Sequence, residues 1–249
     1  MYGDQSNYWG AGFLGSRLCD RLIYVGHRVI GMDNVINGRV SNLNHRVTHI
    51  VFQFIRNSVT KHISIEEEDS IPHFASTASP KDYSSNPIHI LTVGAIGTLN
   101  ALRLVRSKNA CFCLASISEV CGSTLESPQN EAYWGNVNPV GPRNVYDEAK
   151  RFTESIAMAY MREHEVNTRI IRTFITYGLR MRPSDGTVLP NFIIHALTGK
   201  PLTIYRDRPQ TRSFCYVDDL LGGFYRMLNT SASSLDSCSA RTINLGGNE

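Results

Sequence analysis

Two residues in the second half of the chain, Tyr146 and Lys150, have the types and the spacing for acid–base chemistry. A separation of four positions places both side chains on one face of a helix. A nearby ammonium group favours the phenolate, so it lowers the pKa of the tyrosine toward the working range of a general base. The same spacing also occurs by chance, as a surface tyrosine beside a solvated lysine, and the surrounding sequence must decide.

The pair Ser118-Glu119 is a second candidate for catalysis. It follows the apolar run ACFCLASI, residues 110–117, which predicts a buried strand that delivers the polar pair to one end of a sheet. Ile117 stands directly beside the pair, where a hydroxyl group would be more useful to a reaction. The local sequence leaves open whether this is a working catalytic strand or the remains of one.

A glycine-rich segment near the N-terminus has the spacing of a dinucleotide-binding turn. Residues 10–15 read GAGFLG at the start of a helical pattern, and Asp33 follows eighteen residues after Gly15. Glycine allows a tight turn and lets the backbone approach a pyrophosphate at the helix N-terminus. An acidic residue after the next strand accepts hydrogen bonds from the adenosine ribose and favours NAD over NADP. The alternative is a glycine-rich turn without a ligand.

The periodicity of the chain predicts the elements that would bring these groups together. Helical and strand-like patterns alternate, which implies a parallel sheet with helices on both faces. We therefore predict an α/β fold with a doubly wound, Rossmann-like parallel sheet. Residues 1–9 are polar, so the strand that should precede the glycines is expected to be short, disordered or altered. We expect helices at 12–26, 96–109 and 146–165, and strands at 27–34, 49–55, 110–118 and 167–178.

Composition argues against several classes of function. The net charge is +3, and no run of Lys or Arg is dense enough to track a nucleic-acid backbone. The six cysteines include no CxxC pair, so neither a metal site nor a disulfide framework is indicated. No apolar run reaches 18 residues, and no signal-peptide pattern opens the chain. We expect no nucleic-acid partner, no membrane partner and no metal, and a cytoplasmic location, which free thiols also favour.

The motifs above, read together, carry a family resemblance. The chain resembles the extended short-chain dehydrogenase/reductases, and among them the UDP-glucuronate decarboxylases, also called UDP-xylose synthases. The resemblance rests on GAGFLGS, SISEV, YWGNVNPVGPRNVYDEAKR, PLTIY and QTRSF, and it runs from about Gly10 to Glu249. It implies NAD as cofactor and UDP-glucuronate as substrate, converted to UDP-xylose through a 4-keto intermediate. It also implies an NAD-binding domain over residues 1–174 and a substrate-binding segment over 175–249 that lacks the C-terminal part of the usual domain.

The resemblance also assigns roles to individual residues. Tyr146 would take the proton from the sugar 4-hydroxyl, and Lys150 would position the nicotinamide ribose. Glu119 and Ser118 resemble the residues of the decarboxylation step, and Arg212 resembles an arginine near the reacting sugar and diphosphate, which a planar guanidinium suits. The implied cofactor-binding residues are Gly10, Gly12, Phe13, Leu14, Gly15, Asp33, Asn34, Phe74, Ser76, Lys150 and Thr176, and the implied substrate-binding residues are Asn100, Tyr146, Asn191 and Arg212.

The chain departs from the family pattern at several ligand-facing positions. Ile117 stands where the family has a Thr or Ser that hydrogen-bonds the sugar 4-oxygen. Losing one such bond costs roughly 2–4 kcal/mol of transition-state stabilisation, about a hundredfold to a thousandfold in rate. The other departures are Trp9, Ser58, Thr92, Cys121, Ile175, Arg206 and Arg208.

Three interpretations therefore stand side by side. The first is a UDP-glucuronate decarboxylase. The second is a catalytically impaired relative that still binds a nucleotide sugar, which Ile117 favours. The third is a sister NAD-dependent epimerase or dehydratase, although 4,6-dehydratases place an Asp-Glu pair where this chain has Ser118-Glu119. The family commonly forms dimers through the Tyr-Lys helix, and the apolar face of FTESIAMAYM suits a homodimer and ordinary packing on the sheet equally well.

Overall fold

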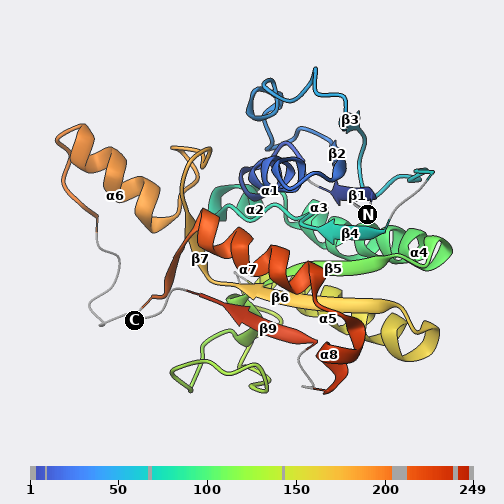
Figure 1. Cartoon of the computed structure of the whole chain (residues 1–249). Helices are drawn as coiled ribbons and strands as arrows, with labels where there is room; N and C mark the ends of the chain where they lie inside the picture. The colour runs from blue at the N-terminus through green and yellow to red at the C-terminus, as the bar shows by residue number, and fades with distance from the viewer. Residues whose placement is uncertain are drawn as a thin grey trace.

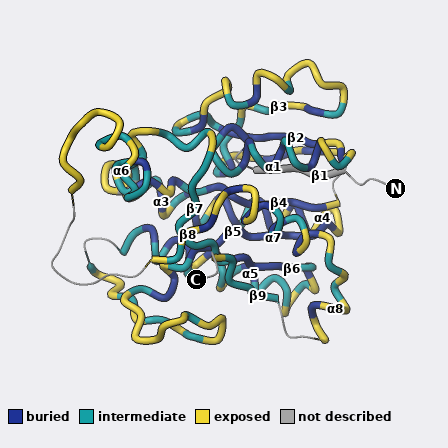
Figure 2. The backbone as a smooth tube through the Cα atoms, turned by 60° about the vertical axis from the view of Figure 1, so that its left-hand side comes forward, coloured by how far each residue is buried: buried dark blue, intermediate teal, exposed yellow. Residues whose placement is uncertain are grey.

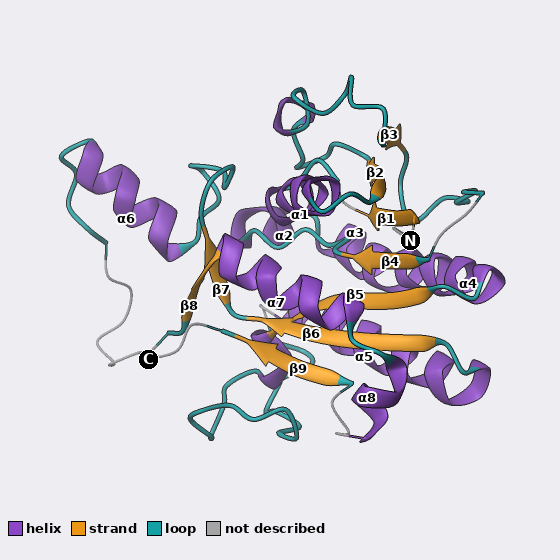
Figure 3. Ribbon diagram, in the orientation of Figure 1, coloured by secondary structure: helices purple, strands orange, loops and turns teal. Residues whose placement is uncertain are grey.

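The structure is a computed structural model that describes residues 4–8, 10–66, 69–141, 144–203, 212–237 and 241–246. Its centre is a seven-stranded parallel sheet in the order β3-β2-β1-β4-β5-β6-β9 (Figures 1 and 3). The strand order reverses between β1 and β4, as in a doubly wound sheet, so the predicted fold class is confirmed. The strands are β1 Asp4–Tyr8, β2 Arg28–Asp33, β3 Phe52–Arg56, β4 Ser70–His73, β5 Cys111–Ile117, β6 Asn167–Thr173 and β9 Thr242–Leu245.

Helices cover both faces of the sheet because the strand side chains alternate between two apolar clusters. In β5, Cys111, Cys113 and Ala115 join the cluster that includes the buried faces of α1 and α7. Phe112 and Leu114 join the opposite cluster, which includes α4 and part of α5. Figure 2 shows β2 and β5 buried between these layers. The helices are α1 Phe13–Tyr24, α2 Pro80–Ser85, α3 Pro87–Thr92, α4 Thr98–Lys108, α5 Asn144–His164, α6 Val188–Leu197, α7 Val217–Asn229 and α8 Ala232–Ser237.

The first strand forms in full although its sequence is polar. β1 pairs with β2 over five residues, from Asp4 opposite Arg28 to Tyr8 opposite Met32, and it pairs with β4 on its other side. Backbone pairing on both sides supplies partners for its N–H and C=O groups, whichever side chains the strand carries. The expectation of a disordered or altered first strand is therefore corrected, and the glycine turn follows a central strand as the nucleotide-binding pattern requires.

The predicted strand over residues 167–178 is two strands in two sheets. β6 ends at Thr173, and β7, Ile175–Tyr177, pairs with β8, Phe214–Tyr216, in a separate two-stranded sheet. Phe174 lies between them, and its backbone N–H donates to the carbonyl oxygen of Leu245 at the end of β9. The sequence does not reveal such a change of sheet, because residues rich in β-branched side chains lie on both sides of Phe174.

The chain returns to the main sheet after the predicted boundary at residue 174. The buried face of α7 packs in the same apolar cluster as α1, and β9 pairs with β6 from Thr242 opposite Ile170 onward. The described part of residues 175–249 therefore contributes the helix α7 and the strand β9 to the layers of the main sheet, and the division of the chain at residue 174 stays a prediction. In Figure 1, α6 is the helix that extends away from the sheet.

One helical stretch, Pro87–Lys108, is long and apolar enough to cross a membrane by length and composition alone. It joins α3 to α4 through a π-helical turn, η2, Val93–Gly97. Half of its most apolar window is buried inside the protein. A core helix of a globular fold passes the same test, and α4 supplies four side chains to the apolar core.

Candidate active site

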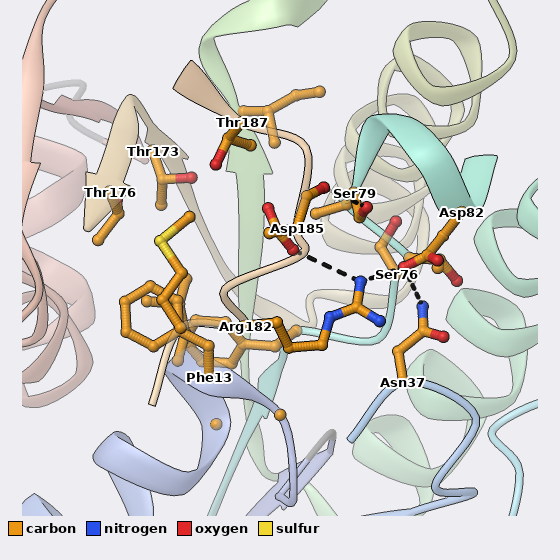
Figure 4. A pocket seen from close by; sticks show the side chains of 18 of the residues that line it. Phe13, Asn37, Ser76, Ser79, Asp82, Thr173, Thr176, Arg182, Asp185 and Thr187 are labelled. Atoms are coloured by element: carbon orange, nitrogen blue, oxygen red, sulfur yellow. Dashed lines mark hydrogen bonds and ion pairs between the residues drawn. The ribbon is translucent and has the colours of Figure 1, made fainter. Parts of the chain in front are cut away.

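One cavity of about 260 Å³ opens where the carboxyl ends of the central strands meet α5. β1 leads into the glycine turn, β4 into Phe74, β5 into Ile117 and Glu119, and β6 into Thr173. Parallel strands present such residues at one edge, so the topology brings together segments that are far apart in the sequence. Figure 4 shows labelled cavity residues from the ends of these strands, such as Phe13, Ser76 and Thr173, together with residues of the surrounding loops and helices. The predicted site residues that line it are Gly12, Phe13, Leu14, Gly15, Phe74, Ser76, Glu119, Tyr146 and Thr176.

The glycine turn ends in a helix N-terminus that no side chain caps. Gly12 is the N-cap of α1, makes no side-chain cap hydrogen bond, and is followed by a first turn without acidic residues. The helix dipole therefore leaves partial positive charge facing the cavity, which suits a diphosphate. Gly10 has a different role, because a Cβ there would lie 2.7 Å from the Cα of Gly31. It lets the turn pack on β2, and it does not line the cavity.

Asp33 supports the glycine turn from the end of β2. Its carboxylate accepts hydrogen bonds from the backbone N–H of Ala11, at 3.0 Å, and of Val35, at 2.7 Å. Burial raises the pKa of Asp33, while these backbone donors oppose the shift. Neither Asp33 nor Asn34 lines the cavity, and the Asn34 side chain accepts from the N–H of Ile36 at 3.1 Å. The contact between Asp33 and an adenosine ribose stays a prediction.

Tyr146 reaches the cavity from the first turn of α5. It is buried in a small apolar cluster that also holds Ile117, Ile90 and Ala149. Tyr146 and Ile117 both line the cavity. The isoleucine that replaces a hydroxyl residue therefore stands in the neighbourhood of the phenol, where its side chain can neither donate nor accept a hydrogen bond.

Lys150 lies behind the cavity wall, one helical turn after Tyr146. Its side chain is buried, and Nζ donates to the carbonyl oxygen of Ala115 in β5 at 2.7 Å. Burial lowers the pKa of Lys150 to about 8, with Glu154 acting in the opposite direction. The charge of Lys150 also contributes, after burial itself, to lowering the pKa of the buried His73 to about 3. Lys150 shares the Tyr146 face of α5 as predicted, but it does not line the cavity.

Glu119 brings a perturbed carboxylate into the cavity. It lies in the short helical turn η3, Ser118–Cys121, and accepts a hydrogen bond from the Ser118 hydroxyl at 3.1 Å. Although part of its surface is accessible in the cavity, desolvation by the surrounding protein raises its pKa, and Ser118 and Arg212 oppose the shift. Burial, then the charges of Glu119 and Glu148, raise the pKa of Asp147 to about 6. The structure thus brings Ser118, Glu119 and Arg212 close enough to interact, while their roles in a reaction stay predictions.

Two predicted substrate residues lie away from the cavity lining. Asn100, on α4, donates to the carbonyl oxygens of Val59 and Lys61 at 2.9 and 3.2 Å, so it holds the loop after β3. Asn191, on α6, is half-buried and does not line the cavity. Their substrate contacts stay predictions without support from the geometry.

The positions that depart from the family pattern have varied surroundings. Ile175 lines the cavity, whereas Cys121 is buried in the apolar cluster around Tyr146. The Thr92 hydroxyl donates to the carbonyl oxygen of Ile88 within α3 at 2.8 Å, and Ser58 pairs with Thr60. Trp9, Arg206 and Arg208 lie outside the described residues.

Sequence reasoning missed a group of polar residues on the outer walls of the cavity. They come from the loop after β2, from α2 with the residue before it, and from the loop after β7. Their positions depend on how these loops fold over the sheet, and no motif or spacing marks them. The group comprises Asn37, Arg39, Asn42, Ser79, Asp82, Arg180, Arg182, Asp185 and Thr187. Among the described residues, no group of three His, Cys, Asp or Glu side chains is arranged to hold a metal ion.

Comparisons with known proteins give one matching family and several similar curated proteins. The NAD dependent epimerase/dehydratase family matches residues 10–246. UDP-glucuronic acid decarboxylase 1 of Danio rerio is 46% identical over 240 residues, which cover 96% of this chain and 56% of that protein. UDP-glucuronic acid decarboxylase 4 of Arabidopsis thaliana is 47% identical over 88% of this chain and 49% of that protein. The chain spans about half the length of these curated relatives.

Solved structures of related enzymes share the fold. UDP-glucuronic acid 4-epimerase from Bacillus cereus in complex with NAD is 26% identical, with a TM-score of 0.80 over 99% of this chain and 79% of that one. UDP-glucose 4-epimerase from Thermotoga maritima with UDP-glucose is 25% identical, with a TM-score of 0.83 over 98% of this chain and 76% of that one. The cavity described above therefore lies in a fold whose solved examples hold NAD or a nucleotide sugar.

Proposed function

Because this chain belongs to the NAD dependent epimerase/dehydratase family, we propose that it binds NAD and UDP-glucuronate and converts the latter to UDP-xylose, with its oxidation step slowed by Ile117. The observation that carries the proposal is the shared cavity of Tyr146, Glu119 and the uncapped N-terminus of α1. The similarity to UDP-glucuronic acid decarboxylases at 46–47% identity supports this choice over the sister epimerases and dehydratases, whose solved structures are 22–26% identical.

The residues present fit a dinucleotide. The uncapped α1 N-terminus, without acidic neighbours in its first turn, would hold the diphosphate, and Phe13, Phe74, Ser76 and Thr176 would line the rest of the cofactor. NAD bound there would supply reversible oxidation and reduction at C4 of the sugar. Lys150 is held by the Ala115 carbonyl and would keep the end of β5 in register with α5 beneath that site.

The chain's own residues would then move protons and hold charge. Tyr146 would take the proton of the sugar 4-hydroxyl. Together with the two-electron oxidation at C4 that NAD would supply, this gives a ketone at C4, β to the carboxylate on C5. Loss of carbon dioxide breaks the bond between C5 and the carboxyl carbon and leaves its electron pair as an enolate. A proton then adds to C5, and the ketone is reduced again to give UDP-xylose. Glu119, with Ser118 and Arg212 beside it, is placed to hold charge at the decarboxylation step.

Ile117 favours a second candidate function. A buried isoleucine in the Tyr146 cluster removes a hydroxyl from the place where the sugar 4-oxygen would lie. The loss of one such hydrogen bond slows a reaction by roughly a hundredfold to a thousandfold, about 2–4 kcal/mol. If the reaction is slowed so far that no product forms, the chain is a relative that binds a nucleotide sugar without converting it.

One experiment separates the two candidates. The purified protein is incubated with UDP-glucuronate and NAD, and the nucleotide sugars are analysed by mass spectrometry. We expect slow formation of UDP-xylose, and at least a thirtyfold faster reaction for Ile117→Thr, since a hydroxyl is restored beside Tyr146. Ile90→Val, in the same cluster, is the matched control. If neither protein forms UDP-xylose or a 4-keto product, while both bind NAD, the non-catalytic candidate holds.

We also propose a homodimer and a cytoplasmic location. Ile88, Leu91, Ile96 and Phe152 are exposed apolar side chains on α3, η2 and α5, and these elements contact one another. This arrangement supports a surface that a second copy would cover. The five described cysteines are buried thiols, which suits a reducing compartment. Fractionation of cells that express the tagged natural protein would test the location, since recovery with membranes or in the medium would contradict it.

A further inference from the structure

The loop between β7 and α6, residues 178–187, forms one wall of the cavity. Arg180, Arg182 and Asp185 from this loop line it, opposite residues of the loop after β2 and of α2. Arg180 adopts a left-handed backbone conformation, with φ at 76°, which is uncommon for a residue with a side chain. The path of the loop is therefore held by contacts that offset an unfavourable local geometry.

Arg182 fastens this loop to the facing wall. Its guanidinium donates from Nη2 to Oδ2 of Asp82 on α2, and lies 3.5 Å from Oδ1 of Asp185 in its own loop. Asp82 Oδ2 also accepts from Nδ2 of Asn37, in the loop after β2, at 2.9 Å. Figure 4 shows Arg182 between Asp185 and Asp82, with Asn37 on the other side of Asp82. Three segments that line the cavity thus meet at one carboxylate.

Two further contacts fix the loop around this ion pair. The Ser79 hydroxyl, next to α2, donates to the backbone carbonyl of Asp185 at 2.6 Å. On the other flank, Arg180 donates from Nη2 to Oδ2 of Asp20 on α1 at 2.6 Å. The loop is therefore attached to α1 and to α2, the two helices on either side of the cavity.

The Arg182–Asp82 ion pair is partly shielded from solvent, so it can hold the loop in place. The two side chains are 24% and 23% exposed, so the pair is protected from much of the screening that weakens surface ion pairs. Two carboxylates face the one guanidinium, and Arg182 consequently offers no excess positive charge to a diphosphate. Its arrangement suits the fastening of one wall to the other better than the binding of an anion.

We propose that Arg182 and Asp82 form a clasp across the cavity that retains the dinucleotide between the two halves of the reaction. The inference rests on the proposed function, in which the same sugar is oxidised and later reduced again. If the reduced dinucleotide leaves after the oxidation, the 4-keto sugar cannot be reduced again. An enzyme of this kind therefore needs to release the dinucleotide slowly. Asp82 and Arg182 are positioning residues in this role, since they hold the walls and take no part in bond making.

The rate of NADH release tests the clasp. Protein loaded with NADH is mixed with excess NAD, and the fall in NADH fluorescence is followed by stopped flow. We expect Asp82→Asn to release NADH about tenfold faster, which corresponds to about 1.4 kcal/mol. Equal release rates for the two proteins would overturn the proposal.

Two further variants test whether faster release follows from loss of the ion pair or from a general loss of structure. The charge exchange Asp82→Arg with Arg182→Asp, combined with Asp185→Asn to remove the second carboxylate beside position 182, should restore slow release, because it rebuilds the pair with reversed polarity. The carboxylate of Asp236 on α8 is 63% exposed and pairs with Arg241. Asp236→Asn removes this ion pair and should leave the release rate unchanged. Fast release from the charge-exchange protein would contradict a clasp.

Amide hydrogen exchange provides a readout that needs no cofactor. Exchange over residues 178–187 should be faster in Asp82→Asn than in the natural protein, and slow again after charge exchange. A natural protein that fails to bind NADH would refute the proposed cofactor, and the exchange measurement would still decide the clasp. Unchanged exchange in Asp82→Asn would show that the ion pair does not fasten the loop.

Discussion

Ile117 contributes to the stability of the fold at a position where a hydroxyl group would contribute to catalysis. It is buried in the cluster that holds Tyr146, so its methyl groups contribute apolar packing at the place where a hydroxyl would serve a sugar. Replacing it by threonine removes buried apolar area and adds a polar atom. The Ile117→Thr protein should therefore be less stable by about 1–2 kcal/mol even if it is faster.

Asp147 should make the stability of the protein depend on pH. Burial and the neighbouring Glu119 and Glu148 raise its pKa from 3.8 to about 6, so the folded state binds this proton more tightly than the unfolded state. Below about pH 4 the carboxyl group of Asp147 is protonated in the folded and in the unfolded state, so its raised pKa does not change the free energy of unfolding. As the pH rises from there through 6, the free energy of unfolding falls progressively. Asp147→Asn should raise the free energy of unfolding by about 1 kcal/mol at pH 8, after discounting for solvent screening, and by little near pH 4.

Urea denaturation at several pH values between 4 and 8 would measure this effect. Asp69→Asn, at an exposed aspartate before β4, is the control and should change stability by the same small amount at every pH. A gain for Asp147→Asn that does not grow with pH would show that the carboxylate is not the cause.

At the scale of elements, prediction from sequence succeeded where burial leaves a periodic trace. β5 and α5 carry such traces, the first as the run from Cys111 to Ile117 and the second as an apolar stripe along 21 residues. β1 carries none, since its place between β2 and β4 is set by backbone pairing. The cavity residues divide in the same way: Tyr146 and the glycine turn belong to motifs, whereas Asp82 and Arg182 meet only through the folding of loops.

The ion pair between Glu154 and Arg172 should be important for joining α5 to β6. Arg172 donates to both carboxylate oxygens of Glu154, at 2.9 and 2.8 Å, and the Ser116 hydroxyl in β5 donates to the same carboxylate at 2.6 Å. Both charged side chains are largely buried. Removing one partner of such a pair leaves the other charge poorly compensated, so Glu154→Gln should cost about 3 kcal/mol of unfolding free energy.

Chemical denaturation would test this element-level role against a surface control. Glu163→Gln removes a carboxylate from the same helix, where it is 77% exposed, and should change stability by less than about 0.5 kcal/mol. Similar values for the two variants would mean that solvent, or a rearranged neighbour, replaces the Glu154 contact without loss.

At the scale of the molecule, the exposed apolar side chains of α3 and α5 predict self-association. Ile88 is 79% exposed on α3, and Phe152 is exposed on the adjoining α5. Covering such side chains removes apolar surface from water, so a second copy should bind there. Ile88→Glu should shift the protein from dimer to monomer in light scattering after size-exclusion chromatography. Ile50→Glu, at a 97% exposed position before β3, should leave the mass unchanged, and a monomeric natural protein would refute the dimer.

The position of β9 has a consequence for how the chain folds during synthesis. β9 is added parallel to β6, about 70 residues downstream, and β6 cannot acquire this neighbour until residues 242–245 have left the ribosome. Until then β6 presents an unpaired strand edge, which other chains can join. Long-range parallel pairing is also slow to form. Newly made protein should therefore depend on chaperones most strongly in the interval between the emergence of β6 and that of β9.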